Sequence, residues 1–161
     1  METPSSTALR WIASLRLPAL PESVRTARRD VRRMLDTHHE TTDTGDDTEL
    51  LVSELVTNAV TAIQGATPRG EQTTPGPTPD VTVVVARDEE RLWLSVSDPV
   101  PLLPAPRTAD IADEGGRGLA LVQALSDRWG ADRTPNGKTV WCAMPAPQTV
   151  SPSARLAPAN G

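Results

Sequence analysis

Apolar residues occupy every second position over residues 9–17, an alternation that predicts a first β-strand ending at Pro18. The spacing then becomes helical, and Pro21 and Glu22 open a helix that is predicted to reach about Asp36. The change of period separates the first strand from the first helix.

A second apolar helical stripe covers about residues 48–64 and is broad enough to pack against a sheet. Asp46 or Asp47 is the expected N-cap of this helix. Residues 65–80 follow, with clusters of glycine and proline and almost no large apolar side chain. This stretch is predicted to be a long loop or an insertion.

Two further strands are predicted over residues 81–86 and 92–96, and they turn at Asp88-Glu89-Glu90. Residues 99–114 contain four prolines and are expected to be irregular. The two strands therefore form a hairpin that is followed by a second irregular segment.

The glycine run Gly115-Gly116-Arg117-Gly118 leads into a third helix, predicted from Leu119 to about Arg128. A last hairpin joins residues 129–133 to residues 138–144. Its Asn136-Gly137 pair supplies the positive φ that a tight hairpin turn requires.

This order of elements predicts the fold class. Helices grouped between runs of strands favour a two-layer α/β sandwich, in which a mixed, mostly antiparallel sheet is covered by helices on one face. Residues 1–8 are interpreted as a flexible leader, residues 9–145 as the domain, and residues 146–161 as a disordered tail.

Composition narrows the class of protein. A chain of 161 residues with 37% hydrophobic and 23% charged residues is typical of one soluble domain. There is no long apolar run, and residues 1–10 lack the pattern of a signal peptide. The net charge of −5 and the absence of Phe and Tyr argue against nucleic-acid binding. With its single cysteine, Cys142, the chain is predicted to be cytoplasmic, with no disulfide and no membrane partner.

The run Glu54-Leu55-Val56-Thr57-Asn58-Ala59 is the most informative motif. Glu54 and Asn58 are four residues apart, so both side chains lie on one face of the predicted second helix. An asparagine is unfavourable inside a helix, whereas its carbonyl oxygen is a suitable ligand for Mg²⁺. A neighbouring carboxylate can act as a base, so the pair is a candidate site, although Glu-x-x-x-Asn alone is common by chance.

Two later motifs have chemistry of the same kind. Asp98 ends the strand Ser95-Val96-Ser97, where it can accept a hydrogen bond from a base or simply start a turn before Pro99. The glycine run before the third helix lets backbone N–H groups approach a phosphate at a helix N-terminus. It lacks the lysine of a Walker loop and the spacing of a dinucleotide fingerprint.

The order of these motifs resembles the GHKL superfamily of ATP-binding domains, which includes gyrase, histidine kinases and MutL. The chain is most similar to the small anti-sigma-factor serine kinases of the RsbW-like type (HATPase_c domains) and their actinobacterial relatives. The resemblance covers about residues 9–145. It rests on the Glu54–Ala59 run as the N box, Asp98 as the start of the first glycine box, Gly116-Arg117-Gly118-Leu119-Ala120-Leu121-Val122 as the second, and Gly137-Lys138-Thr139-Val140-Trp141 as the closing strand.

The resemblance implies a role for each matching residue. Glu54 would be the catalytic base that activates a serine hydroxyl, and Asn58 would coordinate the Mg²⁺ that bridges the phosphates of ATP. Asp98 would read adenine, with Thr139 close to it. The phosphates would be cradled by the backbone of Gly116, Arg117, Gly118 and Leu119.

The implied function is that of an ATP-dependent serine/threonine-protein kinase and anti-sigma factor, whose partners are a sigma factor and an anti-anti-sigma protein. Homodimers occur among such relatives. The family's Asp-x-Gly-x-Gly box reads Asp98-Pro99-Val100-Pro101-Leu102 here. The alternative is therefore a catalytically weak or inactive module that regulates a protein partner by binding alone. A third hypothesis, ranked last, is a detached catalytic domain of a phosphorelay.

Two features stay open outside these motifs. The first helix carries arginines that form either a solvated face or a partner-docking surface: Arg25, Arg28, Arg29, Arg32 and Arg33. His38-His39-Glu40 invites comparison with a histidine-kinase phosphoacceptor, but a solvated helix end is the ordinary interpretation.

Overall fold

The computed structural model describes residues 9–40, 42–66, 76–103 and 114–146. Three helices and five strands lie in these ranges. In chain order they are β1 (Trp11–Pro18), α1 (Ser23–Thr37), α2 (Thr42–Ala66), β2 (Asp80–Arg87), β3 (Arg91–Asp98), α3 (Glu114–Leu125), β4 (Arg128–Thr134) and β5 (Gly137–Pro145).

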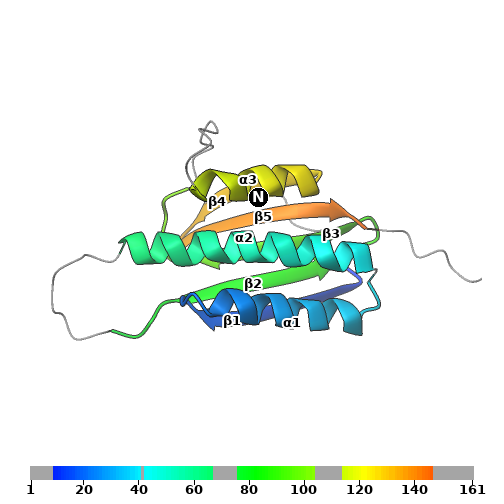
Figure 1. Ribbon diagram of the computed structural model, residues 1–161, viewed down its shortest axis with the longest axis horizontal. Helices are drawn as coiled ribbons and strands as arrows, with labels where there is room; N and C mark the ends of the chain where they lie inside the picture. Colours follow the sequence, from blue (N-terminus) through cyan, green and yellow to red (C-terminus); the bar gives the residue numbers. More distant parts are fainter. Residues whose placement is uncertain (1–8, 41, 67–75, 104–113, 147–161) are drawn as a thin grey trace, which may run out of the picture.

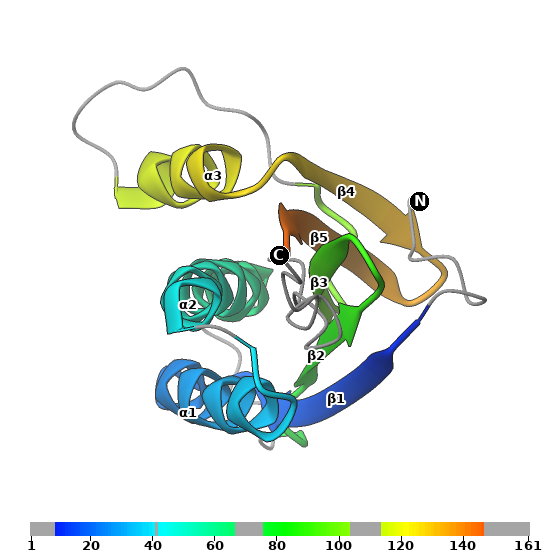
Figure 2. The same ribbon diagram turned by 90° about the vertical axis from the view of Figure 1, so that its right-hand side faces the viewer.

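The strands form one sheet in the order β1-β2-β3-β5-β4. All three helices lie on the same side of this sheet, with α2 between α1 and α3 (Figures 1 and 2). The two-layer sandwich is therefore confirmed. The described strands differ from the predicted mixed sheet in one respect, because all four of their pairings are antiparallel.

Alternation along the strands divides the sheet into two faces. Leu92, Leu94 and Val96 of β3 belong to the main core beneath the helices, together with Val140 and Cys142 of β5. The residues between them point to the other face, where Trp93 and Trp141 pack against each other in a smaller cluster. Neighbouring residues of one strand therefore serve opposite faces of the sheet.

Helix α2 begins earlier than predicted. It starts at Thr42 rather than near Thr48, so Asp46 and Asp47 lie inside the helix and do not cap it. Gly45 is an unfavourable residue in a helix interior. The Arg32 side chain covers it from α1, with its Nη1 atom only 2.9 Å from where a Cβ would lie. This contact between helices outweighs the local preference.

Helix α3 is also shifted, since it spans Glu114–Leu125 rather than Leu119 to Arg128. The glycine run is therefore its first turn and not a loop ahead of it, because a helix start tolerates glycine when packing supports it. The chain then turns at once into β4, where Arg128 pairs with Ala143 of β5.

The last hairpin is present, but its turn is built differently from the prediction. Thr134 pairs directly with Gly137, so Pro135 and Asn136 are the two turn residues. The positive φ falls on Gly137, at +146°, and not on Asn136. A proline at the first turn position has a suitable fixed φ, which explains this choice.

Several predicted segments lie outside the described residues: the leader over 1–8, most of the 65–80 loop, and all but Ala146 of the predicted tail. Gly65 itself belongs to α2, which continues to Ala66. Among the described residues, every helix is too short or too polar to cross a membrane.

Candidate functional site

The predicted pair Glu54 and Asn58 meets the glycine run in the structure. Both side chains are half-buried on α2, and Gly118 of α3 lies directly against them. A Cβ at Gly118 would be 2.6 Å from Glu54 Oε2 and 3.5 Å from Asn58 Nδ2. A side chain at position 118 would displace the Glu54 carboxylate, so the glycine lets α3 pass close to these two side chains. Two motifs that are far apart in the sequence therefore meet at one place.

The glycine run places the helix start next to this pair. The N–H groups of a first helical turn have no partner within the helix. Gly116 and Arg117 belong to that turn, whereas Leu119 is one turn further and its N–H is part of the helical ladder. The backbone groups available to an anion are therefore at the start of the run. The Arg117 side chain lies outside what the structure describes.

Asp98 and its strand partner lie at the same end of the molecule. The end of β3, the start of β5, the C-terminal half of α2 and the start of α3 gather at the left of Figure 1. By alternation, Asp98 continues the row of Leu94 and Val96 and faces the helices. The predicted base-recognition residue is thus on the same side of the sheet as Glu54 and Asn58.

The carboxylate of Asp98 already has partners within the chain. Lys138 lies opposite it on β5, and the Lys138 Nζ atom is 2.9 Å from Asp98 Oδ2 and 3.0 Å from Asp98 Oδ1. The backbone N–H of Val100 donates to Asp98 Oδ1 at 2.9 Å. The Asp98 side chain is only 1% exposed and that of Lys138 only 5%. Asp98 therefore belongs to a buried ion pair.

Thr139 is directed away from this pair. Its hydroxyl forms a 2.7 Å hydrogen bond with the hydroxyl of Ser97 on the face of the sheet that lacks helices. The structure therefore does not bring the Thr139 side chain to Asp98. Sequence reasoning named Thr139 and missed Lys138, although residues 98 and 138 were both placed at strand ends and alternation separates the side chains of 138 and 139.

The fit of ATP and Mg²⁺ differs between the two ends of this site. Mg²⁺ usually takes one or two protein oxygens together with waters and phosphate oxygens. Asn58 and Glu54 can supply such oxygens, and no larger cluster of ligating side chains occurs in the described ranges. The phosphate end therefore fits. The base end does not, because the carboxylate of Asp98 is buried and bonded to Lys138.

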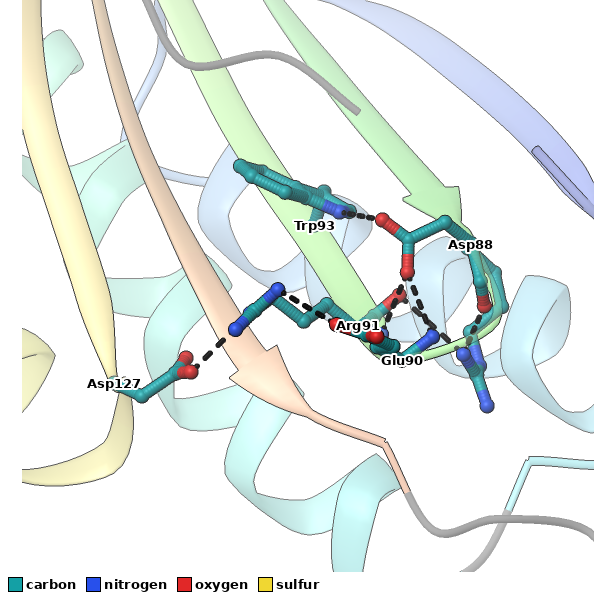
Figure 3. Close-up of polar contacts among 6 residues, drawn as sticks. Asp88, Glu90, Arg91, Trp93 and Asp127 are labelled. Carbon is teal, nitrogen blue, oxygen red and sulfur yellow. Dashed lines mark hydrogen bonds and ion pairs between the residues drawn. The ribbon is translucent and has the colours of Figure 1, made fainter. Parts of the chain in front are cut away.

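A second polar cluster lies at the opposite end of β3 (Figure 3). Asp88 accepts hydrogen bonds from the N–H groups of Glu90 and Arg91 at 2.9 and 2.7 Å, and from Trp93 Nε1 at 2.7 Å. Desolvation opposes ionisation of Asp88, but these hydrogen bonds and the nearby Arg87 outweigh it and lower the pKa of the carboxyl group. Arg91 continues the cluster to Asp127, at 3.2 Å.

His38-His39-Glu40 has a structural place at the end of α1. The His38 ring stacks on Trp11 of β1, with centroids 4.3 Å apart and planes 5° from parallel. Glu40 accepts a hydrogen bond from Trp11 Nε1 at 3.4 Å and lies 3.4 Å from Arg87 Nε. His39 adopts φ +57°, which turns the chain toward α2. The run therefore ends α1, leads into α2 and packs against Trp11 of β1 and Arg87 of β2.

The basic face of α1 is partly neutralised within the chain. Arg32 bonds Asp46, at 2.8 Å, and Glu49, at 3.2 Å, and so ties α1 to α2. Arg29 pairs with its neighbour Asp30 at 2.9 Å. The remaining predicted members of the face, Arg25, Arg28 and Arg33, are exposed.

Cys142 and a hollow near the C-terminal end of β5 stand apart from the candidate site. Burial raises the pKa of the Cys142 thiol to about 12, so this cysteine is an inert core residue. The hollow, about 440 Å³, lies at the far ends of α2, α3 and β5. Its lining residues are Asp43, Thr44, Asp47, Leu125, Met144, Pro145 and Ala146, none of which is a predicted site residue.

Comparisons with known proteins agree with the motif order. Residues 17–144 match the histidine kinase-like ATPase domain. A solved structure of the RsbU and RsbW domains of Rv1364c from Mycobacterium tuberculosis superimposes with a TM-score of 0.58 at 20% identity. The match covers 83% of this chain and 32% of that one. This likeness shows the fold.

A curated relative is the uncharacterized protein SCO4941 of Streptomyces coelicolor, which is 41% identical over 51 residues. The matched stretch is 30% of this chain and 49% of that protein. The chain therefore matches about half of this curated relative and about a third of the solved chain.

Proposed function

The chain belongs to the histidine kinase-like ATPase domain family, and on that premise we propose that it is a cytoplasmic, RsbW-like protein kinase and anti-sigma factor. In this proposal ATP is the phosphoryl donor and Mg²⁺ its metal. The acceptor is a serine of an anti-anti-sigma protein, and the regulated partner is a sigma factor.

The observation that carries the proposal is the contact of Glu54 and Asn58 with Gly118. It brings the Asn58 carboxamide, the Glu54 carboxylate and the start of α3 to one place. Phosphoryl transfer depends chiefly on positioning and charge stabilisation, so a small set of this kind is sufficient. Mg²⁺ bound at Asn58 would neutralise phosphate charge, and the N–H groups at the start of α3 would favour an anion.

The role of Glu54 follows from the proton that the reaction releases. When the serine oxygen forms its bond to the γ-phosphorus, the bond to ADP breaks and the hydroxyl proton has to leave. A carboxylate one helical turn from the metal ligand is the acceptor for that proton. The Glu54 side chain is only half-buried, so its carboxylate is within reach of a bound substrate.

A second candidate function is regulation by binding alone. The buried Asp98–Lys138 pair favours it, because this pair occupies the carboxylate that the family's adenine recognition requires. In that case the chain holds a protein partner without transferring phosphate. Stoichiometric capture of an anti-anti-sigma protein, without phosphoserine, is the result that would select this function.

Calorimetric titration with ATP tests the nucleotide site. Saturable binding that requires Mg²⁺ and is lost in Asn58→Ala is the expected result. Gln64→Ala is the matched control, because Gln64 is exposed on the last turn of the same helix. An Asn58→Ala protein that binds Mg-ATP as well as the wild type would contradict the assigned metal ligand.

Phosphotransfer tests the base. Incubation with labelled ATP and an anti-anti-sigma protein should give phosphoserine, and Glu54→Gln should reduce the rate by about 10²–10⁴-fold while ATP binding persists. An unchanged rate in Glu54→Gln would remove Glu54 from the mechanism and leave the metal site untouched.

A further inference from the structure

Lys138 is the only lysine in the sequence, and it is buried. All the other residues in the chain's Lys+Arg total of 16 are arginines. Lysine is among the residues that are almost never fully buried without a partner. Its position in the core therefore indicates that the Asp98 partner is a fixed part of the fold.

Every donor of the Lys138 ammonium group is used within the chain. Two contacts go to Asp98, at 2.9 and 3.0 Å, and the third goes to the backbone oxygen of Val100 at 3.1 Å. An ammonium group has three hydrogens, so no donor remains for a ligand. Asp98 receives both this cation and the N–H of Val100.

The chain around the pair holds it closed. Val100 is bonded through its N–H to Asp98 and through its carbonyl oxygen to Lys138, and its side chain packs on the main core. Pro99 lies between Asp98 and Val100 in the chain, and its ring fixes its own φ. Gly137 lies so close that a Cβ there would be 1.9 Å from the Asp98 carbonyl oxygen. Movement of the carboxylate would therefore require several neighbours to move as well.

We infer that the Lys138 ammonium group stays paired with the Asp98 carboxylate, which would otherwise recognise the base, and that Lys138 thereby sets the nucleotide preference of the site. With Lys138 in place, Asp98 does not read the base, and any nucleotide is held through its phosphates near Asn58 and α3. Removing Lys138 returns the carboxylate to the site. The inference rests on the proposed function, because it concerns the same nucleotide site.

The decisive comparison is between ATP and ITP, in which a carbonyl oxygen replaces the 6-amino group of adenine. An available carboxylate accepts a hydrogen bond from that amine and repels the oxygen. A hydrogen bond to a charged group corresponds to a preference for ATP of about tenfold or more. A site that ignores the base binds both nucleotides with similar affinity.

The titrations use wild type, Lys138→Ala and the double variant Lys138→Ala/Asp98→Asn at about pH 8, where an aspartate is ionised. Alanine is chosen because it removes the ammonium group and opens the space above Asp98. We expect the wild type to bind ATP and ITP with similar affinity. Lys138→Ala should prefer ATP by about tenfold or more, and the double variant should lose that preference.

Two results would overturn the inference: a wild-type protein that already prefers ATP about tenfold, or a folded Lys138→Ala protein without any preference. A separate measurement tests the proposed function: the wild type should bind Mg-ATP, and Asn58→Ala should not. If the wild type binds both nucleotides and Asn58→Ala binds neither, the proposed metal site is supported, even if Lys138→Ala shows no preference for ATP.

A test on the wild type covers the case in which Lys138→Ala does not fold. Reductive methylation modifies accessible amines, and the single lysine makes the result unambiguous at the peptide level. The peptide that contains Lys138 should stay unmodified in the native protein and become dimethylated in urea. Methylation of native Lys138 at the rate of an exposed lysine would overturn the closed pair and the inference with it.

Discussion

Strand β3 has an aspartate at each end, and the two are held in different ways. Asp88 precedes the strand and accepts hydrogen bonds from Glu90, Arg91 and Trp93, which are at most five residues away. Asp98 ends the strand, and its charged partner Lys138 is 40 residues away on β5. The first aspartate completes a local turn, whereas the second depends on the pairing of β3 with β5.

The two aspartates are held by different kinds of polar contact. Around Asp88 the donors are backbone and indole N–H groups within a single hairpin. Around Asp98 two opposite charges are buried together, which is tolerated only while both are present. Substitutions at the Asp98 end should therefore affect the whole domain, and substitutions at the Asp88 end should affect it less.

Gly137→Ala should have the largest effect on stability. Its Cβ would lie 1.9 Å from the Asp98 carbonyl oxygen and 2.6 Å from Pro99 Cα, and φ is +146°. These are backbone atoms that cannot move aside as a side chain would. We expect a loss of more than about 5 kcal/mol, which is comparable with the whole stability of many domains. Urea denaturation followed by circular dichroism measures it.

Gly65→Ala is the matched control for that substitution. Gly65 is exposed near the end of α2, and a Cβ there meets no atom within 4 Å. Alanine is a better helix former than glycine by about 1 kcal/mol, so this variant should be as stable as the wild type or slightly more stable. A Gly137→Ala protein as stable as Gly65→Ala would show that the two strand ends do not touch as described.

Lys138→Met should have the next largest effect, because it leaves the Asp98 carboxylate buried without its cation. Breaking a buried pair from one side costs about 3–5 kcal/mol. The double variant Asp98→Asn/Lys138→Met should recover part of that loss, since it buries no unpaired charge. Urea midpoints of the two single variants and the double variant give the coupling energy between the residues.

An exposed ion pair of the same sheet is the control for the Lys138 series. Arg16 and Asp80 are 3.2 Å apart, with side chains 75% and 44% exposed. Exposed pairs contribute about 0–1 kcal/mol, so Arg16→Met should change stability little. If Lys138→Met is as mild as Arg16→Met, the Asp98 end is no more demanding than the surface.

The same contrast explains what could be predicted from the sequence. The Asp88 turn, the strands on either side of it and the helical face of Glu54 and Asn58 follow from residues close together in the chain. The convergence of Glu54 and Gly118 was predictable only from the resemblance to a known family. Local periodicity carries no information on which helix crosses which.

The misplaced features depend on long-range contacts. Helix α2 extends through Gly45 because Arg32 of α1 covers that glycine. The turn residues Pro135 and Asn136 were missed because the usual Asn-Gly pattern pointed one residue further on. Lys138 was overlooked because its role appears only when β3 and β5 are paired and residue 138 is seen opposite Asp98.

Asp88→Asn should have the smallest effect of the series and the clearest dependence on pH. An amide can still accept from the backbone N–H groups, but its NH₂ group cannot accept from Trp93 Nε1. The loss should be about 1–2 kcal/mol at pH 7. Glu89→Gln is the control, because Glu89 is an exposed residue of the same turn.

The direction of the pH effect follows from the lowered pKa of Asp88. Its hydrogen bonds favour the ionised carboxylate, so their contribution is complete above the ordinary value of 3.8 and is lost as the pH falls through the folded-state pKa. The wild type and Asp88→Asn should therefore differ most near neutral pH and converge in acid. Urea midpoints followed by tryptophan fluorescence across that range measure the difference. A constant difference at all pH values would mean that Asp88 acts by shape and not by charge, and the contrast between the two ends of β3 would then rest on Asp98 alone.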